Sequence, residues 1–285
     1  MSPELLGLLT SITFACGHTL ARQSLLGSDA RTTTLVNAAS QGVFLSTLSL
    51  ALVPLSGLKN TGIIFFVVDG LTVPAMARWL LFYGMNRIGL SRATSIAGIA
   101  PLFSFTIALA LLREEFTLII LGATISIVLG VALVAKKKEE APWRGRDIIF
   151  PIMAAIIWAI SPNLRKMGLQ AGVHPLVGGA VSASVSVVVM ASIITFSAGW
   201  KGLKFGIKAT SFQLLSGLTH GLAVLFYIYA LQGGKVIVVA PLANSTALFT
   251  LPLALLFFRS REGITRYTVL GTFLIVFGIF ALFAR

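Results

Sequence analysis

Charged residues are scarce in this chain, and acidic ones are the scarcest. Asp, Glu, Lys and Arg make up 11% of the 285 residues, with nine acids against 22 Lys and Arg, while 56% of the residues are hydrophobic. A soluble domain carries roughly 25% charged residues. This chain therefore has too little polar surface to cover a water-exposed globule of its length, and the composition indicates a polytopic membrane protein.

Several features that other functions require are also missing. Cys16 is the only cysteine, so no intrachain disulfide can form. No third ligand at metal spacing accompanies His18 and His220, and no phosphate-binding loop is present, so we expect neither a metal nor another cofactor. No catalytic Ser/His/Asp order stands out, which argues against an enzyme. Basic and aromatic residues do not alternate as nucleic-acid binding would require.

What the sequence does contain is a series of long apolar runs. Backbone polar groups must be satisfied inside a bilayer, and these runs are too long for the alternating strands of an outer-membrane barrel, so we expect helices. The first run begins near Leu5 without a basic leader, so we expect no signal peptide. We predict an all-α integral membrane protein with ten transmembrane helices, at 5–25, 33–55, 64–85, 90–112, 116–135, 148–168, 175–198, 211–232, 236–258 and 265–284.

The chain divides into two similar halves. The polar stretch "KKKEEAPWRGRD" (136–147) separates a first five-helix repeat, 1–135, from a second, 148–285. "FACGHTLARQ" from Phe14 matches "WAISPNLRKM" from Trp158, and Glu115 matches Glu262. Because five is an odd number, the second repeat must enter the membrane inverted, an arrangement typical of secondary transporters.

The basic residues of the loops divide unevenly between the two sides of the membrane. Fifteen Lys and Arg fall on the side of the charged linker, and Arg78 lies within a span. Six are assigned to the opposite side: Lys59, Arg113, Arg165, Lys166, Lys235 and Arg285. The positive-inside rule then places the linker in the cytoplasm and both chain ends outside.

Two segments resemble a known family. "YGMNRIGLSRATSIAGIAPLFSFTIALALLREEFTLIILG" (83–122) and its counterpart "YALQGGKVIVVAPLANSTALFTLPLALLFFRSREGIT" (229–265) are similar to the EamA type of the drug/metabolite transporter superfamily. The resemblance implies ten helices in two inverted repeats and the export or uptake of small metabolites. It implies a central cavity lined by helices three, four, eight and nine, with help from helices one and six. It also implies cytoplasmic chain ends, against the charge count.

Arg78 is the most unusual residue of the apolar runs. A charge at the centre of a span costs about 2.5–3.5 kcal/mol on insertion scales, and an intramembrane Arg usually faces a wet cavity or the bundle interior. Its guanidinium could hold the carboxylate of a substrate through two parallel hydrogen bonds. A structural arginine that bonds backbone carbonyls or snorkels along its helix is an equal alternative.

Other residues are candidates for the same cavity. Aromatic walls and small polar groups suggest further substrate contacts, although lipid contact, core packing and helix–helix bonding explain them equally well. These candidates are Trp79, Phe82, Trp158, Tyr227, Asn244 and Ser245. His18, His220 and Asp69 are candidates for carrying a coupling proton, with an interhelical hydrogen bond as the alternative for the histidines and a headgroup-level position as the alternative for Asp69. Glu114, Glu115 and Glu262 are expected in short turns, at helix starts or in loop ion pairs.

The sequence therefore predicts a secondary transporter of the cell membrane, the inner or plasma membrane, which it crosses many times. It would export small metabolites such as amino acids or related carboxylates by alternating access around a midplane cavity. Its partners would be a small-molecule substrate and the lipid bilayer, and a monomer suffices for this mechanism. The alternative is a lipid-headgroup flippase or a lipid-handling membrane enzyme.

Cysteine labelling tests the orientation. In a background without Cys16, a Lys137→Cys variant should resist a membrane-impermeant thiol reagent in intact cells and react after lysis, because the charge excess places the linker in the cytoplasm. Labelling of intact cells would show that the charge count gives the wrong orientation.

Overall fold

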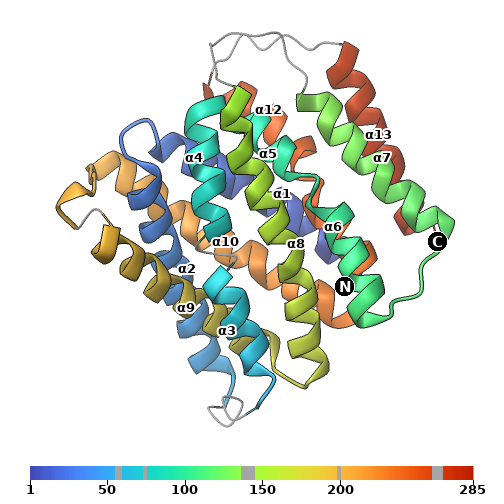
Figure 1. The fold of residues 1–285 in the computed structure, drawn as a ribbon, viewed down its shortest axis with the longest axis horizontal. Coiled ribbons are helices and arrows are strands. Elements are labelled where there is room, and N and C mark those ends of the chain that lie inside the picture. The colour runs from blue at the N-terminus through green and yellow to red at the C-terminus, as the bar shows by residue number, and fades with distance from the viewer. Residues whose placement is uncertain (55–59, 73–75, 136–144, 198–199, 259–265, 285) are drawn as a thin grey trace.

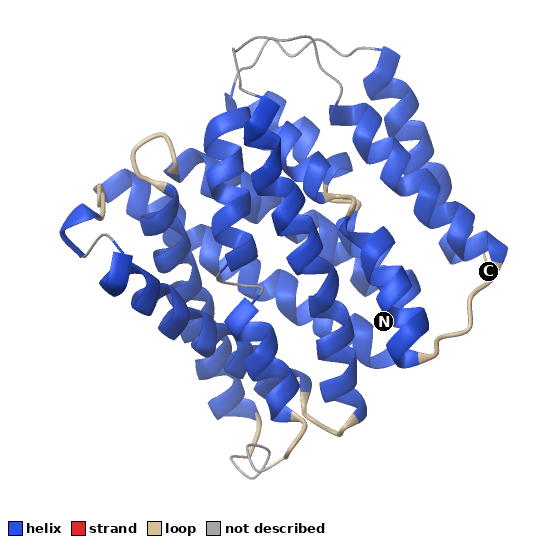
Figure 2. Cartoon of the chain, viewed as in Figure 1, coloured by secondary structure: helices blue, strands red, loops and turns tan. Residues whose placement is uncertain are grey.

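Helices make up all the regular structure of the residues described here (Figure 2). The computed structural model describes residues 1–54, 60–72, 76–135, 145–197, 200–258 and 266–284. Five of its helices are long and apolar enough to cross a membrane, and several shorter apolar helices accompany them. Lys59, Lys137, Glu262 and Arg285, which the sequence analysis named, lie outside the described residues.

Seven of the ten predicted runs form a single helix, each within a few residues of its predicted bounds. They are α1 (Pro3–Ser24), α2 (Ala30–Leu52), α7 (Leu118–Ala135), α8 (Ile149–Gln170), α9 (Pro175–Ser197), α10 (Ile207–Gly233) and α13 (Arg266–Phe283). The run of apolar residues sets their length, and polar side chains set where two of them begin.

The starts of α1 and α2 show this capping. The Ser2 side chain accepts a hydrogen bond from the Leu5 backbone N–H, and the Asp29 carboxylate accepts from the N–H groups of Arg31 and Thr32. Partial burial raises the pKa of Asp29, but hydrogen bonds from Thr32 and from two other backbone groups outweigh it and lower the pKa below its usual value.

Three predicted runs are not single helices. The run 64–85 contains α3 (Ile63–Thr72) and α4 (Arg78–Ile88). The run 90–112 divides into α5 (Leu90–Ala97), α6 (Ala100–Ile107) and a π-helical segment, η3 (Ala108–Leu112). Gly98 weakens the helix at the first of these breaks, and Pro101, which has no backbone N–H, is accommodated in the first turn of α6.

The run 236–258 divides into α11 (Val236–Asn244) and α12 (Ala247–Phe258). The break falls at Ser245 and Thr246, whereas Pro241 and Pro252 both lie inside helices. Proline is therefore not the cause of this break. At the break, polar side chains bond carbonyl oxygens of the preceding turn.

The helices of the two halves pack against one another. α1 runs along α10, α2 packs on α9 and α10, α3 on α8 and α9, and α7 on α13, a pair that runs side by side at the right of Figure 1. Each half thus buries its helices largely against the other half. An inverted repeat would produce such an exchange of partners, but the two-fold relation itself, the count of ten spans and the division at the linker stay predictions.

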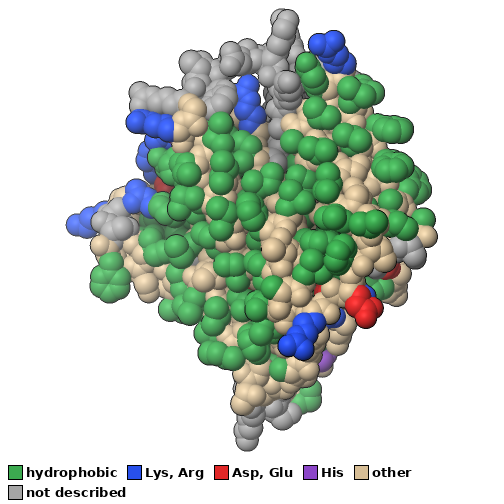
Figure 3. All heavy atoms as spheres, turned by 45° about the vertical axis from the view of Figure 1, so that its right-hand side comes forward, with side chains coloured by type: hydrophobic (Ala, Val, Ile, Leu, Met, Phe, Trp, Pro, Cys, Tyr) green, Lys and Arg blue, Asp and Glu red, His purple; other side chains and the backbone are tan. Residues whose placement is uncertain are grey.

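Large apolar side chains cover the outside of the helices. Phe196, Phe273 and Phe280 are 87%, 67% and 69% exposed. Figure 3 shows hydrophobic side chains over the middle of one face, with Lys and Arg toward its upper and lower ends. A water-exposed surface of this kind would aggregate, whereas lipid tails cover it without loss.

α7 and α13 approach each other so closely that only glycine fits at their contact. A Cβ on Gly130 of α7 would lie 2.6 Å from the Gly271 carbonyl oxygen of α13. A Cβ on Gly122, two turns earlier on α7, would meet nothing within 4 Å. Membrane helices use such small residues to bring their backbones together.

The two glycines form a matched pair for a stability test. Gly130→Ala should lower the thermal unfolding temperature in detergent, because the added methyl overpacks the contact at a cost of about 1–3 kcal/mol. Gly122→Ala should leave it unchanged or raise it, because alanine favours the helix by roughly 0.5–1 kcal/mol. Equal effects of the two substitutions would contradict the close contact.

Candidate functional site

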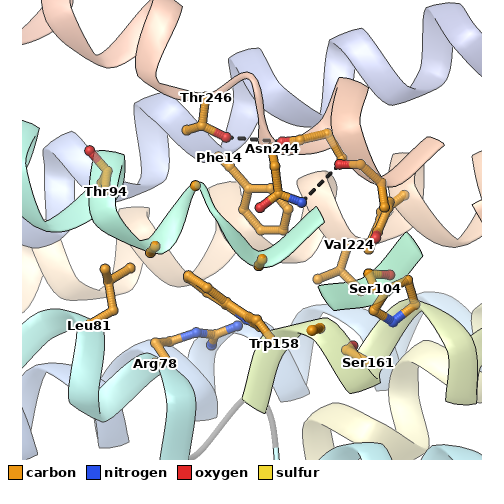
Figure 4. A pocket seen from close by; sticks show the side chains of 18 of the residues that line it. Phe14, Arg78, Leu81, Thr94, Ser104, Trp158, Ser161, Val224, Asn244 and Thr246 are labelled. Atoms are coloured by element: carbon orange, nitrogen blue, oxygen red, sulfur yellow. Dashed lines mark hydrogen bonds between the residues drawn. The ribbon is translucent and has the colours of Figure 1, made fainter. Parts of the chain in front are cut away.

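A cavity lies among α1, α4, α5, α8, α10 and the segments around the breaks of the runs 90–112 and 236–258. It holds about 850 Å³ of space between the atoms, its opening included. Figure 4 shows Arg78 and Trp158 reaching into it from α4 and α8, with Asn244 and Thr246 opposite. Its lining includes the predicted residues His18, Arg78, Trp158, His220, Tyr227 and Asn244, and also Phe14, Thr94, Ser104, Ser161, Arg165 and Thr246.

Arg78 is 5% exposed and is held by a neutral residue. Its Nη1 donates a hydrogen bond of 2.8 Å to the Asn37 Oδ1. Asn37, which is fully buried on α2, is fixed in turn because its Nδ2 donates to the Ser216 hydroxyl at 2.7 Å. Among the described residues, no carboxylate lies within ion-pair distance of Arg78. The guanidinium is thus positioned without being neutralised.

His18 and His220 contact each other beside this group. The His220 Nδ1–H donates to the Ser216 backbone oxygen at 2.7 Å, so its Nε2 is left to accept a hydrogen bond from the His18 Nδ1–H, 3.2 Å away. In this chain of neutral rings the remaining acceptor is the Nε2 of His18. The rings of Phe14 and Trp158 pack against His18, with centroids 5.9 and 6.2 Å from its own.

Asp69 lies in the interior of the helix bundle and not on its surface. It is fully buried, and its Oδ2 bonds the Nε of Arg165 at 3.0 Å. Two hydroxyls complete its partners: Ser161 donates to Oδ1 at 2.5 Å and Ser182 donates to Oδ2 at 2.6 Å. Gly70 makes this possible, because any Cβ there would collide with the Ser182 backbone oxygen of α9.

Arg165 is the partner that sequence reasoning placed wrongly. The charge count assigned it to a loop, because it lies three residues from the end of the predicted run 148–168. In the structure it is 4% exposed on α8, and its guanidinium lies over the Tyr227 ring, 5.8 Å from the centroid. When Arg165 is taken out of the charge count, five Lys and Arg remain on the side opposite the linker. The excess of basic residues on the linker side therefore grows.

At the break between α11 and α12, three consecutive side chains bond carbonyl oxygens of the preceding helical turn. Asn244 Nδ2 donates to the Ala240 oxygen, Ser245 Oγ to the Leu242 oxygen, and Thr246 Oγ1 to the Ala243 oxygen. Ser245 is fully buried and does not line the cavity. Its predicted substrate contact is therefore not supported, because its hydroxyl caps the helix. The bond to Ala240 turns the Oδ1 of Asn244 away from that carbonyl, and this oxygen has no hydrogen-bond partner among the residues that the structure describes.

Trp79 and Phe82 also lie outside the cavity lining. On α4 the side chains of Arg78 and Leu81 face the cavity, and Trp79 is turned about 100° away from Arg78. Trp79 packs beside Tyr83, and Phe82 is fully buried with its edge toward the His220 ring. Both are packing residues of the core around α4.

At the other end of α8, Glu114 caps a helix of the opposite half. Its two carboxylate oxygens accept hydrogen bonds of 2.7 and 3.0 Å from the N–H groups of Val236 and Ile237, the start of α11. Lys166 donates to the backbone oxygens of Leu231 and Gly234. The expectation that Glu114 lies at a helix start is confirmed, although the helix is α11 rather than the one that follows it in sequence.

Comparison with known proteins settles the family. Residues 1–136 and 146–284 match the model of the EamA-like transporter family. The chain belongs to the EamA-like transporter family. The family lies within the drug/metabolite transporter superfamily, so the resemblance found from the motifs is confirmed.

The other comparisons bear on the fold. A solved structure titled "Crystal structure of protein" is similar over 98% of this chain and 95% of its own, with a TM-score of 0.76 and 16% sequence identity. At that identity the likeness concerns the fold alone. No curated protein matches the sequence. Membership in the EamA-like transporter family makes the chain a multi-pass membrane protein that transports small molecules.

Proposed function

We propose that this EamA-like transporter exports small carboxylates, amino acids or related metabolites, by alternating access around the cavity beside Arg78. The observation that carries the proposal is the guanidinium of Arg78, 95% buried and without a carboxylate partner among the described residues. A buried charge that is left unpaired destabilises the protein by several kcal/mol. An anion that enters the cavity would provide the missing partner through charge-assisted bonds.

The rest of the lining suits a small organic acid. Phe14 and Trp158 offer apolar faces to a side chain. The Oδ1 of Asn244 can accept a hydrogen bond from an ammonium group, since its amide nitrogen is already bonded to Ala240. An amino acid would use both the cation at Arg78 and this acceptor.

The broken helices supply the movable parts. Transporters bind substrate at discontinuous helices, because helix ends expose backbone groups and bend at low cost. The breaks at Gly98 and at Ser245–Thr246 both adjoin the cavity lining. We expect these breaks to absorb the bending when one half rocks against the other.

Substitution of Arg78 tests the proposal. Arg78→Leu should raise the Kd for carboxylates roughly tenfold to hundredfold, because the lost charge-assisted bonds contribute about 1.5–3 kcal/mol. Arg78→Lys keeps the charge but loses the planar fork, so a smaller loss is expected. The measurements are binding to the purified protein and efflux from loaded liposomes, with thermal unfolding recorded for each variant.

Arg87→Leu is the matched control, since Arg87 lies on the same helix but is exposed and bonded to Tyr83 outside the cavity. It should transport normally. Normal transport by a folded Arg78→Leu protein would overturn the proposed carboxylate site and leave Arg78 a structural residue.

We further propose that the His18–His220 pair carries a coupling proton. The Nε2 of His18 has no hydrogen-bond partner among the described residues, and His18 borders the same cavity as Arg78, which is linked to the pair through Asn37 and Ser216. A proton here would be repelled by Arg78 until an anion arrives, so anion and proton would bind together. Asp69 is not part of this role, because Arg165 and two hydroxyls already hold its oxygens.

The substitution His18→Asn tests the role of the coupling proton while it keeps the hydrogen bond to His220. The asparagine amide can still donate to His220 Nε2 in place of Nδ1–H, but it cannot titrate. Liposomes with this variant should still exchange substrate across the membrane at equilibrium, while net transport should no longer respond to an imposed pH gradient. His174→Asn, at a histidine outside the cavity, is the control and should respond like the parent. A full response in His18→Asn would exclude the pair as the coupling site.

A further inference from the structure

Two arginines line the cavity, but among the described residues only one carboxylate forms an ion pair with either of them. Arg78 and Arg165 both border it, and both are at least 95% buried. Asp69 bonds Arg165 and does not itself line the cavity. Within the described part of the chain, the two guanidiniums and this carboxylate leave one uncompensated positive charge at the site.

Most nitrogen atoms of the two guanidinium groups form no hydrogen bond with the described residues. Arg78 is bonded through Nη1 alone and Arg165 through Nε alone. The Nε and Nη2 of Arg78 and both Nη atoms of Arg165 therefore lack a protein partner among the described residues. None of these nitrogens is among the fully enclosed side-chain atoms without a partner, so each keeps some accessible surface, and both arginines line the cavity.

Two contacts fix the orientation of the Arg165 guanidinium. Asp69 holds its Nε, and the Tyr227 ring lies against its guanidinium at 5.8 Å. Because the bond to Asp69 uses the inner edge of the group, the two terminal nitrogens form the outer edge, the geometry that binds a carboxylate through two parallel bonds. Asp69 is thus a positioning residue for a second anion site.

From these two forks we propose that the substrate carries two anionic groups, one held by Arg78 and the other by the outer edge of Arg165. The inference rests on the proposed transport of carboxylates and narrows it to dicarboxylates, including those that also carry an ammonium group. A dicarboxylate with one ammonium group has a net charge of −1, which balances the single uncompensated charge of the site. A monocarboxylate would leave the unbonded nitrogens of one buried guanidinium without a partner, which is costly.

A matched series of probes tests this inference. Succinate has two carboxylates, succinamate replaces one by an amide of similar size, and succinamide replaces both. The binding of each to the purified protein should weaken in that order, with succinate at least about tenfold tighter than succinamate, since an amide offers only one acceptor oxygen and no charge.

Arg165→Lys isolates the second site without breaking the salt bridge. The lysine Nζ can replace Nε as the partner of Asp69, but the two outer nitrogens are lost. We expect the succinate affinity of this variant to fall about tenfold, to the level of succinamate, while its succinamate affinity changes less than threefold. Thermal unfolding near that of the parent would show that the pair with Asp69 survives.

The outcomes separate the two proposals. If succinate and succinamate bind equally and Arg165→Lys weakens neither, the substrate needs one anionic group only, and the two-anion inference is wrong while carboxylate transport stands. If none of the carboxylates binds better than succinamide, the carboxylate proposal itself fails. If Arg165→Lys is unstable, Asp69→Asn combined with Arg165→Gln removes both charges together, and equal succinate and succinamate binding in that folded double variant is the result expected.

Discussion

The salt bridge between Asp69 and Arg165 is the constraint on which the interior of this transporter depends. It joins α3 to α8, where the Ser161 hydroxyl adds a second bond, and the hydroxyl of Ser182 extends it to α9. Removing one member of a buried pair costs about 3–5 kcal/mol, because the other charge is left without water or partner. With every oxygen of Asp69 occupied from two helices of the other half, the two halves are fastened where α3, α8 and α9 meet.

The same pairing determines what remains available in the cavity. Since Asp69 is committed to Arg165, the chain has no described carboxylate to offer Arg78, which is supported by the neutral amide of Asn37 instead. Asn37 also ties α2 to α10 through Ser216, whose backbone oxygen orients His220. Two separate sets of bonded polar groups, one around Asp69 and one around Asn37, thus span both halves, and each includes a guanidinium that borders the cavity. The positive character of the site follows from how the few acids are distributed, more than from the number of arginines.

Sequence alone could locate the spans and Arg78, because hydropathy and an isolated charge are local signals. Seven helices match their runs, and Arg78 borders the cavity as its position in an apolar run suggested. The partners were not visible, because a pair such as Asp69 with Arg165 joins residues 96 positions apart. Each looked like an end-of-span residue when read on its own. Asn37 gave no signal either, since a single amide in a run rich in Ser and Thr is unremarkable until its neighbours are known.

The helix breaks were equally hard to foresee, since the one in the run 236–258 falls at Ser245 and Thr246 and not at a proline. Ser245 and Thr246 return their hydroxyls to the preceding turn, and this satisfies carbonyls that the helix no longer uses. The polar contacts between the helices fall into two kinds, which differ in how deeply they are buried. The salt bridge of Asp69 is fully buried and cannot be opened cheaply, whereas the cap that Glu114 provides for α11 and the bonds from Lys166 to the end of α10 are only partly buried. Water can replace the partly buried bonds at little net loss, because folding exchanges them against bonds of similar strength. We infer that a change of access opens the contacts around α11 and bends the chain at its break, while α3, α8 and α9, the helices joined by Asp69, move as one body and carry Arg165 with them.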